Sequence, residues 1–225
     1  MVKNANKGAE VVILNKKQLI ARWNDEQIAE ANRALAAVTG KQNLHKKERV
    51  FPSSPFGQTD AGLEDFRGVV LTETIQYLTV QQVDLSYARF VETASLNTSK
   101  FTNCCFDGVK LNSRYVTHEF SNCSFRGVNL NNARISKRFE NCDFTGSNLS
   151  KAIANDAAFI RCHFSEANFR GAMLMYCRFE ECSFEGASFH NSSLAGSRFI
   201  GETSLLPAWG NTILDGVKVN GEGLV

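Results

Sequence analysis

The residues with the most chemical potential in this sequence are its seven cysteines, which all lie between Cys104 and Cys182. The stretch from Cys177 to Phe184 reads CRFEECSF and places two cysteines five residues apart. Such a pair can be half of a zinc site, half of a disulfide, or a packing feature without chemistry. An odd cysteine count and a start without a signal-peptide core favour free thiols in a reducing compartment. We therefore expect an intracellular, cytoplasmic protein.

The other residue types that carry catalysis form no recognisable site. The four histidines, His45, His118, His163 and His190, make no evident relay with a nucleophile and a carboxylate. The sequence contains no HExxH, no GxSxG and no phosphate-binding glycine loop. We therefore expect no enzymatic activity, no metal and no cofactor.

Charge is distributed unevenly along the chain. Residues 1–50 hold ten Lys and Arg against five Asp and Glu, whereas residues 51–225 hold fifteen against eighteen. A basic arm on a slightly acidic body can contact nucleic acid or an acidic partner, or it can simply be a solvated cap. No apolar run approaches the ~20 residues that a transmembrane helix needs.

A five-residue period runs through the body of the chain and decides how the cysteines are interpreted. From Phe139 to Phe199, every fifth residue is Phe or Leu except Ala154. The residue two places earlier is small at every step from Cys142 to Ser197. A period of five fits neither a helix, at about 3.6 residues per turn, nor a strand, at about two. The sequence therefore predicts a repeat architecture with the pattern small-x-(Phe/Leu)-x-x.

This pattern, which appears as ANF, ASF, SNL, CDF and CSF over about residues 61–201, resembles the pentapeptide-repeat family, whose consensus is Ala-(Asp/Asn)-Leu-x-x. The resemblance implies an all-β solenoid, a right-handed quadrilateral parallel β-helix with four pentapeptides per coil. The central Phe or Leu and the small residue two places before it both point inward in such a coil. Close packing agrees, because a large side chain fills a narrow square core only beside a very small neighbour.

A square coil also requires a second period near twenty residues, and four inward columns with spacings of 19 to 21 provide it over about seven coils. The predicted aromatic core is Phe106, Phe125, Phe144, Phe164 and Phe184 in the first column and Phe139, Phe159, Phe179 and Phe199 in the fourth. The small inward position of the first column holds Cys104, Cys123, Cys142, Cys162 and Cys182. We interpret these five as a packing ladder, since free cysteine behaves as a small buried hydrophobe. Cys105 should point outward and is the one candidate reactive thiol.

One-residue slips interrupt the columns on the two sides that flank the third column, and they predict local bulges or tightened turns. Basic residues recur one coil apart along this edge: Arg114 and His118, then Arg134, Lys137 and Arg138. They are candidates for contact with phosphate or an acidic protein. The alternative is ordinary solvated charge at a bulge.

The sequence divides into four parts. Residues 1–50 are expected to form a basic, partly helical cap, 51–60 a linker, 61–201 the β-helix, and 202–225 an irregular C-terminal cap. Asn15 and Asn24 are N-cap signals, and an apolar stripe from Ile20 to Val38 predicts a helix that covers the first coil. Trp209 is expected to plug the other end.

The absence of catalytic motifs and the regular outer faces favour a non-catalytic protein-binding scaffold with an unidentified protein partner and no direct nucleic acid binding. The resemblance implies an alternative, since some family members mimic B-form DNA and modulate or protect DNA gyrase or topoisomerase IV against quinolones or toxins. A second alternative is a delivered effector or attachment module that acts through the N-terminal segment. A homodimer through a solenoid end is consistent with the family, but the partly polar tail VNGEGLV leaves the oligomeric state open.

Overall fold

The computed structural model describes residues 13–45, 49–91, 93–111, 114–202, 206–207 and 209–224, so the first part of the basic arm, residues 1–12, lies outside the described residues. Two helices, α1 (Lys16–Ala21) and α2 (Asp25–Val38), precede a 3-10 turn at Lys41–Asn43. The strands then follow as β1 (Glu64–Asp65), β2 (Val70–Leu71), β3 (Ile75–Gln76), β4 (Thr79–Gln81), β5 (Val83–Asp84), β6 (Arg89–Phe90), β7 (Leu96–Thr102), β8 (Tyr115–Ser121), β9 (Arg134–Glu140), β10 (Ala158–Ile160), β11 (Arg178–Glu180), β12 (Arg198–Ile200), β13 (Lys218–Val219) and β14 (Glu222–Gly223).

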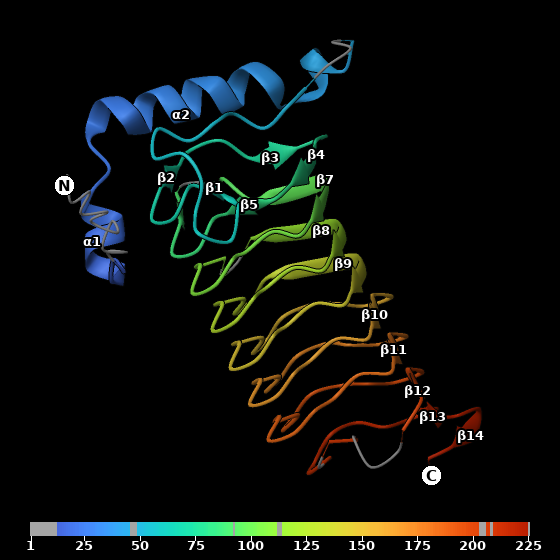
Figure 1. Ribbon diagram of the computed structural model, residues 1–225. Coiled ribbons are helices and arrows are strands. Elements are labelled where there is room, and N and C mark those ends of the chain that lie inside the picture. Colours follow the sequence, from blue (N-terminus) through green and yellow to red (C-terminus); the bar gives the residue numbers. More distant parts are fainter. Residues whose placement is uncertain are drawn as a thin grey trace, which may run out of the picture.

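The strands stack as a β-solenoid of about seven coils, and the helices lie at its N-terminal end (Figure 1). Neighbouring coils pair in parallel: β10, β11 and β12 align Phe159 with Phe179 and Phe179 with Phe199. We number the four walls by their inward residues: the first holds Phe125 and Phe144, the second Leu130 and Leu149, the third Ile135 and Ala154, and the fourth Phe139 and Phe159. The first and second walls pair as short parallel strands in the first coils, β1 with β5 and β2 with β6, and beyond them the remaining sides pair through isolated parallel bridges. This architecture confirms the fold class that the sequence predicts.

The core consists largely of stacked phenylalanines. The nine predicted core rings have at most 3 % of their surface exposed: Phe106, Phe125, Phe144, Phe164, Phe184, Phe139, Phe159, Phe179 and Phe199. Phe139 stacks on Phe120 at 4.9 Å and on Phe159 at 5.2 Å between ring centroids, and it meets Phe144 edge to face at 5.5 Å. Rings of one wall therefore stack from coil to coil, and the ladders of adjacent walls meet edge to face, an arrangement that the ring quadrupole favours.

The corner between the third and fourth walls is irregular in the N-terminal coils, which contain β7, β8 and β9. Strands β8 and β9 each run for seven residues and pass from the third wall to the fourth without a break. At this corner His118 has a φ of 126° and Lys137 a φ of 84°. In β7 the register to β8 shifts between Asn97 and Ser99, and Thr98 between them has a φ of 53°. The slips between the third and fourth columns thus correspond to a bulge and to tightened corners.

The N-terminal segment forms two helices, which corrects the expectation of one apolar stripe. A capping box at Asn24 starts α2: its side chain accepts from the Gln27 amide at 2.8 Å, and its own amide donates to the Gln27 side chain. Because helical structure is interrupted between the two helices, Ile20 and Trp23 do not lie on one helix face. Ile20 is 44 % exposed, whereas Trp23 is buried.

An ion cluster holds the helices on the first coil. The Arg22 guanidinium donates to both carboxylate oxygens of Asp65, and the Arg67 side chain donates to the same carboxylate. Burial alone would raise the pKa of Asp65, but the hydrogen bonds from Arg67 and Arg22 outweigh it and hold that pKa well below its usual range. The Trp23 indole donates to the Arg67 carbonyl at 2.9 Å. Gly68, at a φ of 79°, lets the backbone at Leu19 approach, since a Cβ there would lie 2.6 Å from its carbonyl oxygen.

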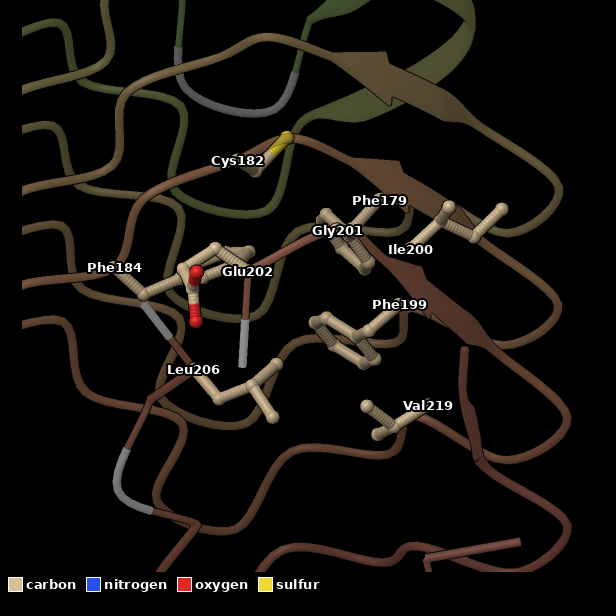
Figure 2. Close-up of a pocket in the computed structure, with 9 residues that line it drawn as sticks. All are labelled: Phe179, Cys182, Phe184, Phe199, Ile200, Gly201, Glu202, Leu206 and Val219. Atoms are coloured by element: carbon tan, nitrogen blue, oxygen red, sulfur yellow. The ribbon is translucent and has the colours of Figure 1, made fainter. Parts of the chain in front are cut away.

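The C-terminal end continues the stack beyond the regular repeats. Figure 2 shows Phe179, Phe199 and Val219 on successive strands along the fourth wall. Trp209 packs on the end of the core with its ring centroid 5.2 Å from that of Phe199. Strand β14 then turns back and pairs antiparallel with β13.

Candidate interaction surface

The cysteine ladder lies inside the first wall and is built for packing. Its members are all buried and unpaired: Cys104, Cys123, Cys142, Cys162 and Cys182. Each thiol lies within weak hydrogen-bond distance of the carbonyl two residues before it and of a carbonyl in the preceding coil; for Cys162 these are Ile160 and Phe139, both at 3.5 Å. Burial raises the pKa of the Cys142 and Cys162 thiols. Among the described residues, no group of three or more His, Cys, Asp or Glu side chains is placed to hold a metal ion.

Cys105 faces out of the first wall, as expected, but its environment does not favour reactivity. The thiol is half-buried and lies 3.0 Å from the Ser86 hydroxyl. Burial, followed by the nearby charge of Asp84, raises the pKa of Cys105 to about 12. A reactive cysteine needs a lowered pKa, so the proposed role of Cys105 as a reactive thiol is not supported.

The predicted basic edge lies at and near the irregular corner. Its residues come from β8, β9 and the segment before β8: Arg114, His118, Arg134, Lys137 and Arg138. Lys137 lies beside His118, but Arg134 lies beside Tyr115 rather than beside Arg114, because the coil here is nineteen residues long. Arg134 instead donates its amide to the Arg114 carbonyl at 2.8 Å. The five residues therefore do not form two matching rows.

Carboxylates neutralise part of this edge on the fourth wall. Arg138 pairs with Glu140 at 2.9 Å, and Arg161 of the next coil binds the other oxygen of the same carboxylate. In the preceding coils, Lys100 of β7 pairs with Glu119 of β8 at 2.8 Å. Hydrogen bonds from Arg138 lower the pKa of Glu140, and one from Lys100 lowers that of Glu119. The fourth wall thus presents alternating ion pairs rather than a continuous cationic strip.

The third wall carries a feature that the sequence interpretation missed: an outward column rich in apolar side chains. Parallel pairing joins its members from coil to coil: Tyr115, Arg134, Ile153, Met173, Ser193 and Ile213. Tyr115 is 51 % exposed, Met173 41 % and Ile213 53 %. The Arg134 guanidinium lies 5.9 Å from the centre of the Tyr115 ring. We call these six residues the third-wall column. A sequence signal existed, since each lies one place before an inward residue of the third column.

A second exposed aromatic side chain extends the apolar surface sideways. Tyr176 is 66 % exposed and lies three residues after Met173. Its ring lies over Gly196 of the next coil, where a Cβ would come within 2.5 Å of the ring. Glycine therefore lets the aromatic ring lie flat against the wall. The exposed apolar side chains of the third wall are thus held in place by the parallel pairing of neighbouring coils.

The stacked four-sided coils define the class: a β-helical repeat protein whose accessible chemistry lies on its outer walls. Residues 136–205, less than half of the chain, match the family model described as a pentapeptide repeat region, so the repeat that the sequence predicts is confirmed over this part of the chain.

Solved structures of the fluoroquinolone resistance protein QnrB1, which is plasmid-mediated, are similar in fold. A trypsin-treated variant is 15 % identical, with 69 % of this chain and 78 % of that chain covered and a TM-score of 0.53. The full-length protein is 17 % identical, with 67 % and 91 % covered and a TM-score of 0.52. At these identities the likeness concerns the fold. No curated protein matches the sequence. No helix among the described residues is long and apolar enough to cross a membrane.

Proposed function

We propose that this protein is a non-catalytic scaffold that binds a protein partner through the third-wall column. The observation that carries the proposal is that Tyr115, Met173 and Ile213 are exposed in one column of the same wall. Aromatic residues, Met and Arg are enriched at protein interfaces relative to other surfaces. The comparisons indicate no enzyme family.

The geometry of the third-wall column suits recognition of a folded or extended protein surface. Six rungs at ~4.8 Å extend over about 24 Å, which is close to the ~28 Å edge of a square patch of the ~800 Å² that each partner buries in a standard interface. Because the side chains stand on a paired backbone, little backbone freedom remains to be lost on binding, which lowers the entropic cost of association.

A matched pair of double variants tests the proposal by affinity capture from the native organism. Ile153→Asp with Met173→Asp places two carboxylates in the third-wall column. Asn148→Asp with Asn168→Asp places them at the corresponding outward positions of the second wall, which are bridged in the same way. We expect a defined protein to be captured by the wild type and by the second-wall control, and lost with the third-wall variant. Equal capture by both variants, or no captured protein with the wild type, would contradict the proposal.

A second candidate function is suggested by the fold of QnrB1: protection of DNA gyrase or topoisomerase IV from fluoroquinolones. Charge argues against DNA mimicry as its basis. A duplex as long as seven coils, ~34 Å, carries about 20 negative charges, whereas residues 51–225 hold only eighteen acidic against fifteen basic residues. A gyrase supercoiling assay with a fluoroquinolone separates the candidates. Restored supercoiling at micromolar protein would support gyrase protection, and no effect would remove it.

A further inference from the structure

A hollow of about 450 Å³ lies between the segment around Leu44 and Arg49 and the irregular corner of the N-terminal coils. Three cationic or ionisable side chains line it: Arg49, Lys100 and His118. Tyr77 and Thr98, which carry hydroxyl groups, line it as well. None of the described residues that line this hollow is acidic. Its chemistry therefore favours an anion.

Two nitrogen atoms at this hollow are buried without a hydrogen-bond partner. They are Nη1 of Arg49 and Nδ1 of His118. Leaving a buried donor unpaired is costly, and the charge of an arginine cannot be removed by deprotonation. A flip of the imidazole ring or a rotation of the guanidinium would turn each nitrogen toward an acceptor held in the hollow. Both side chains thus stand to gain a partner from a ligand.

The backbone at His118 departs from the regular corners of the solenoid. Tyr77, Thr98 and His118 lie at the same corner of successive coils, with φ values of 59°, 53° and 126°. The φ values of Tyr77 and Thr98 resemble those at other corners, such as 54° at Gln82 and 53° at Asn122, whereas the φ value of His118 does not. All three residues line the hollow.

The charges that face the hollow are only partly balanced by neighbours. Glu119, which follows His118, pairs with Lys100 at 2.8 Å, yet the Lys100 side chain stays 56 % exposed. Glu64 lines an adjacent hollow together with Arg49, but its carboxylate accepts from the Ser54 amide at 2.9 Å and from the Gln58 side chain. Within the described residues, Arg49 forms no ion pair.

We propose that this hollow binds a small organic phosphate, with the phosphate group held by Arg49, Lys100 and His118. Arginine and lysine both form strong, charge-assisted hydrogen bonds with phosphate oxygens. The volume lies within the range of small-molecule sites and exceeds what a bare oxyanion fills. Leu44 and Leu78 also line the hollow and supply an apolar wall for the organic part. Tyr115 of the third-wall column lies in the same strand as His118, but no residue of that column lines the hollow, so the site does not depend on the proposed function.

Calorimetric titration of the full chain with phenyl phosphate, inorganic phosphate and phenol tests this site. We expect phenyl phosphate to bind more tightly than inorganic phosphate, and phenol not to bind. Arg49→Gln and His118→Gln should each weaken phenyl phosphate binding by about tenfold. Arg161→Gln, a cation paired with Glu140 outside the hollow, should leave binding unchanged. The thermal midpoint of each variant shows whether it is folded.

The same titration followed by NMR of the imidazole nitrogens locates the ligand, since a phosphate in the hollow should shift the signals of His118 and not those of His163 or His190. Three results would overturn the proposal. They are no binding of phenyl phosphate at about 10 mM, equal affinity for inorganic phosphate, and binding that both Arg49→Gln and His118→Gln leave unchanged. Because Lys100 is exposed, Lys100→Gln supplies a variant with little risk to folding; unchanged affinity there would remove Lys100 from the site.

Discussion

Replacing one stacked phenylalanine in the middle of a ladder should cost more stability than replacing one at its end. Phe139 contacts four aromatic rings, two stacked and two edge to face. Phe101 is the first phenylalanine of the same ladder and contacts two, Phe120 at 5.0 Å and Phe106 at 5.4 Å. Both rings are buried. Leucine keeps most of the apolar volume, so Phe→Leu at each site mainly removes ring contacts.

The magnitude follows from the number of contacts. An aromatic pair contributes about 0.5–1.5 kcal/mol beyond area burial. Phe101→Leu should therefore lower the free energy of unfolding by about 1–3 kcal/mol and Phe139→Leu by about 2–6 kcal/mol. The volume lost is the same at both sites, so the difference of about 1–3 kcal/mol isolates the additional contacts.

Urea unfolding measures this difference, and the two tryptophans show whether the comparison is valid. Trp23 packs at the N-terminal end of the core and Trp209 at the C-terminal end. With single-tryptophan variants, Trp23→Phe or Trp209→Phe, fluorescence reports each end separately. Coincident transitions justify a single free energy. If the two leucine variants were equally destabilised, or if Phe101→Leu cost more, stability would not follow nearest-neighbour ring stacking.

Three further predictions concern the thiols and the N-terminal ion cluster. Cys162→Ala should cost about 1 kcal/mol and Cys162→Leu about 1–3 kcal/mol through overpacking, and thermal unfolding that ranks them the other way would exclude a filled core. An aromatic disulfide reagent at pH 7 should label Cys105 and Cys177 slowly in the native state, because burial raises the pKa of both to about 12; labelling as fast as in guanidinium would contradict this. Asp65→Asn should cost about 3 kcal/mol. Because the native pKa of Asp65 is lowered, its contribution is complete above about pH 4 and is lost as the pH falls toward the native pKa; stability of the wild type should therefore fall more steeply with acid than that of Asp65→Asn, and parallel curves would refute the assignment.

The core could be predicted from the sequence because inward positions obey a strict steric rule. A square coil accepts a large ring only beside a small residue, so Phe164 and Cys162 are fixed by their neighbours on every side. Outward positions obey no such rule. Met173 and Ile213 repeat no residue type, and their shared column is visible only when exposed side chains are followed from coil to coil.

Other features depend on parts of the chain that do not repeat. Arg49 reaches the corner that holds His118 through a connection whose path carries no periodic signal. The cap signal at Asn24 was present in the sequence, yet a continuous apolar stripe masked the helix break before it.

In the C-terminal coils, from β10 onward, successive coils pair at a constant interval of twenty residues, which makes each coil an interchangeable unit. Phe159, Phe179 and Phe199 align directly, and bridges on the other walls keep the same interval, as at Ile153 and Met173. Duplication or loss of one such segment in a gene would return every side chain to its own wall and column. The molecule can therefore change length in steps of one strand spacing, ~4.8 Å, while each exposed surface grows or shrinks by one rung.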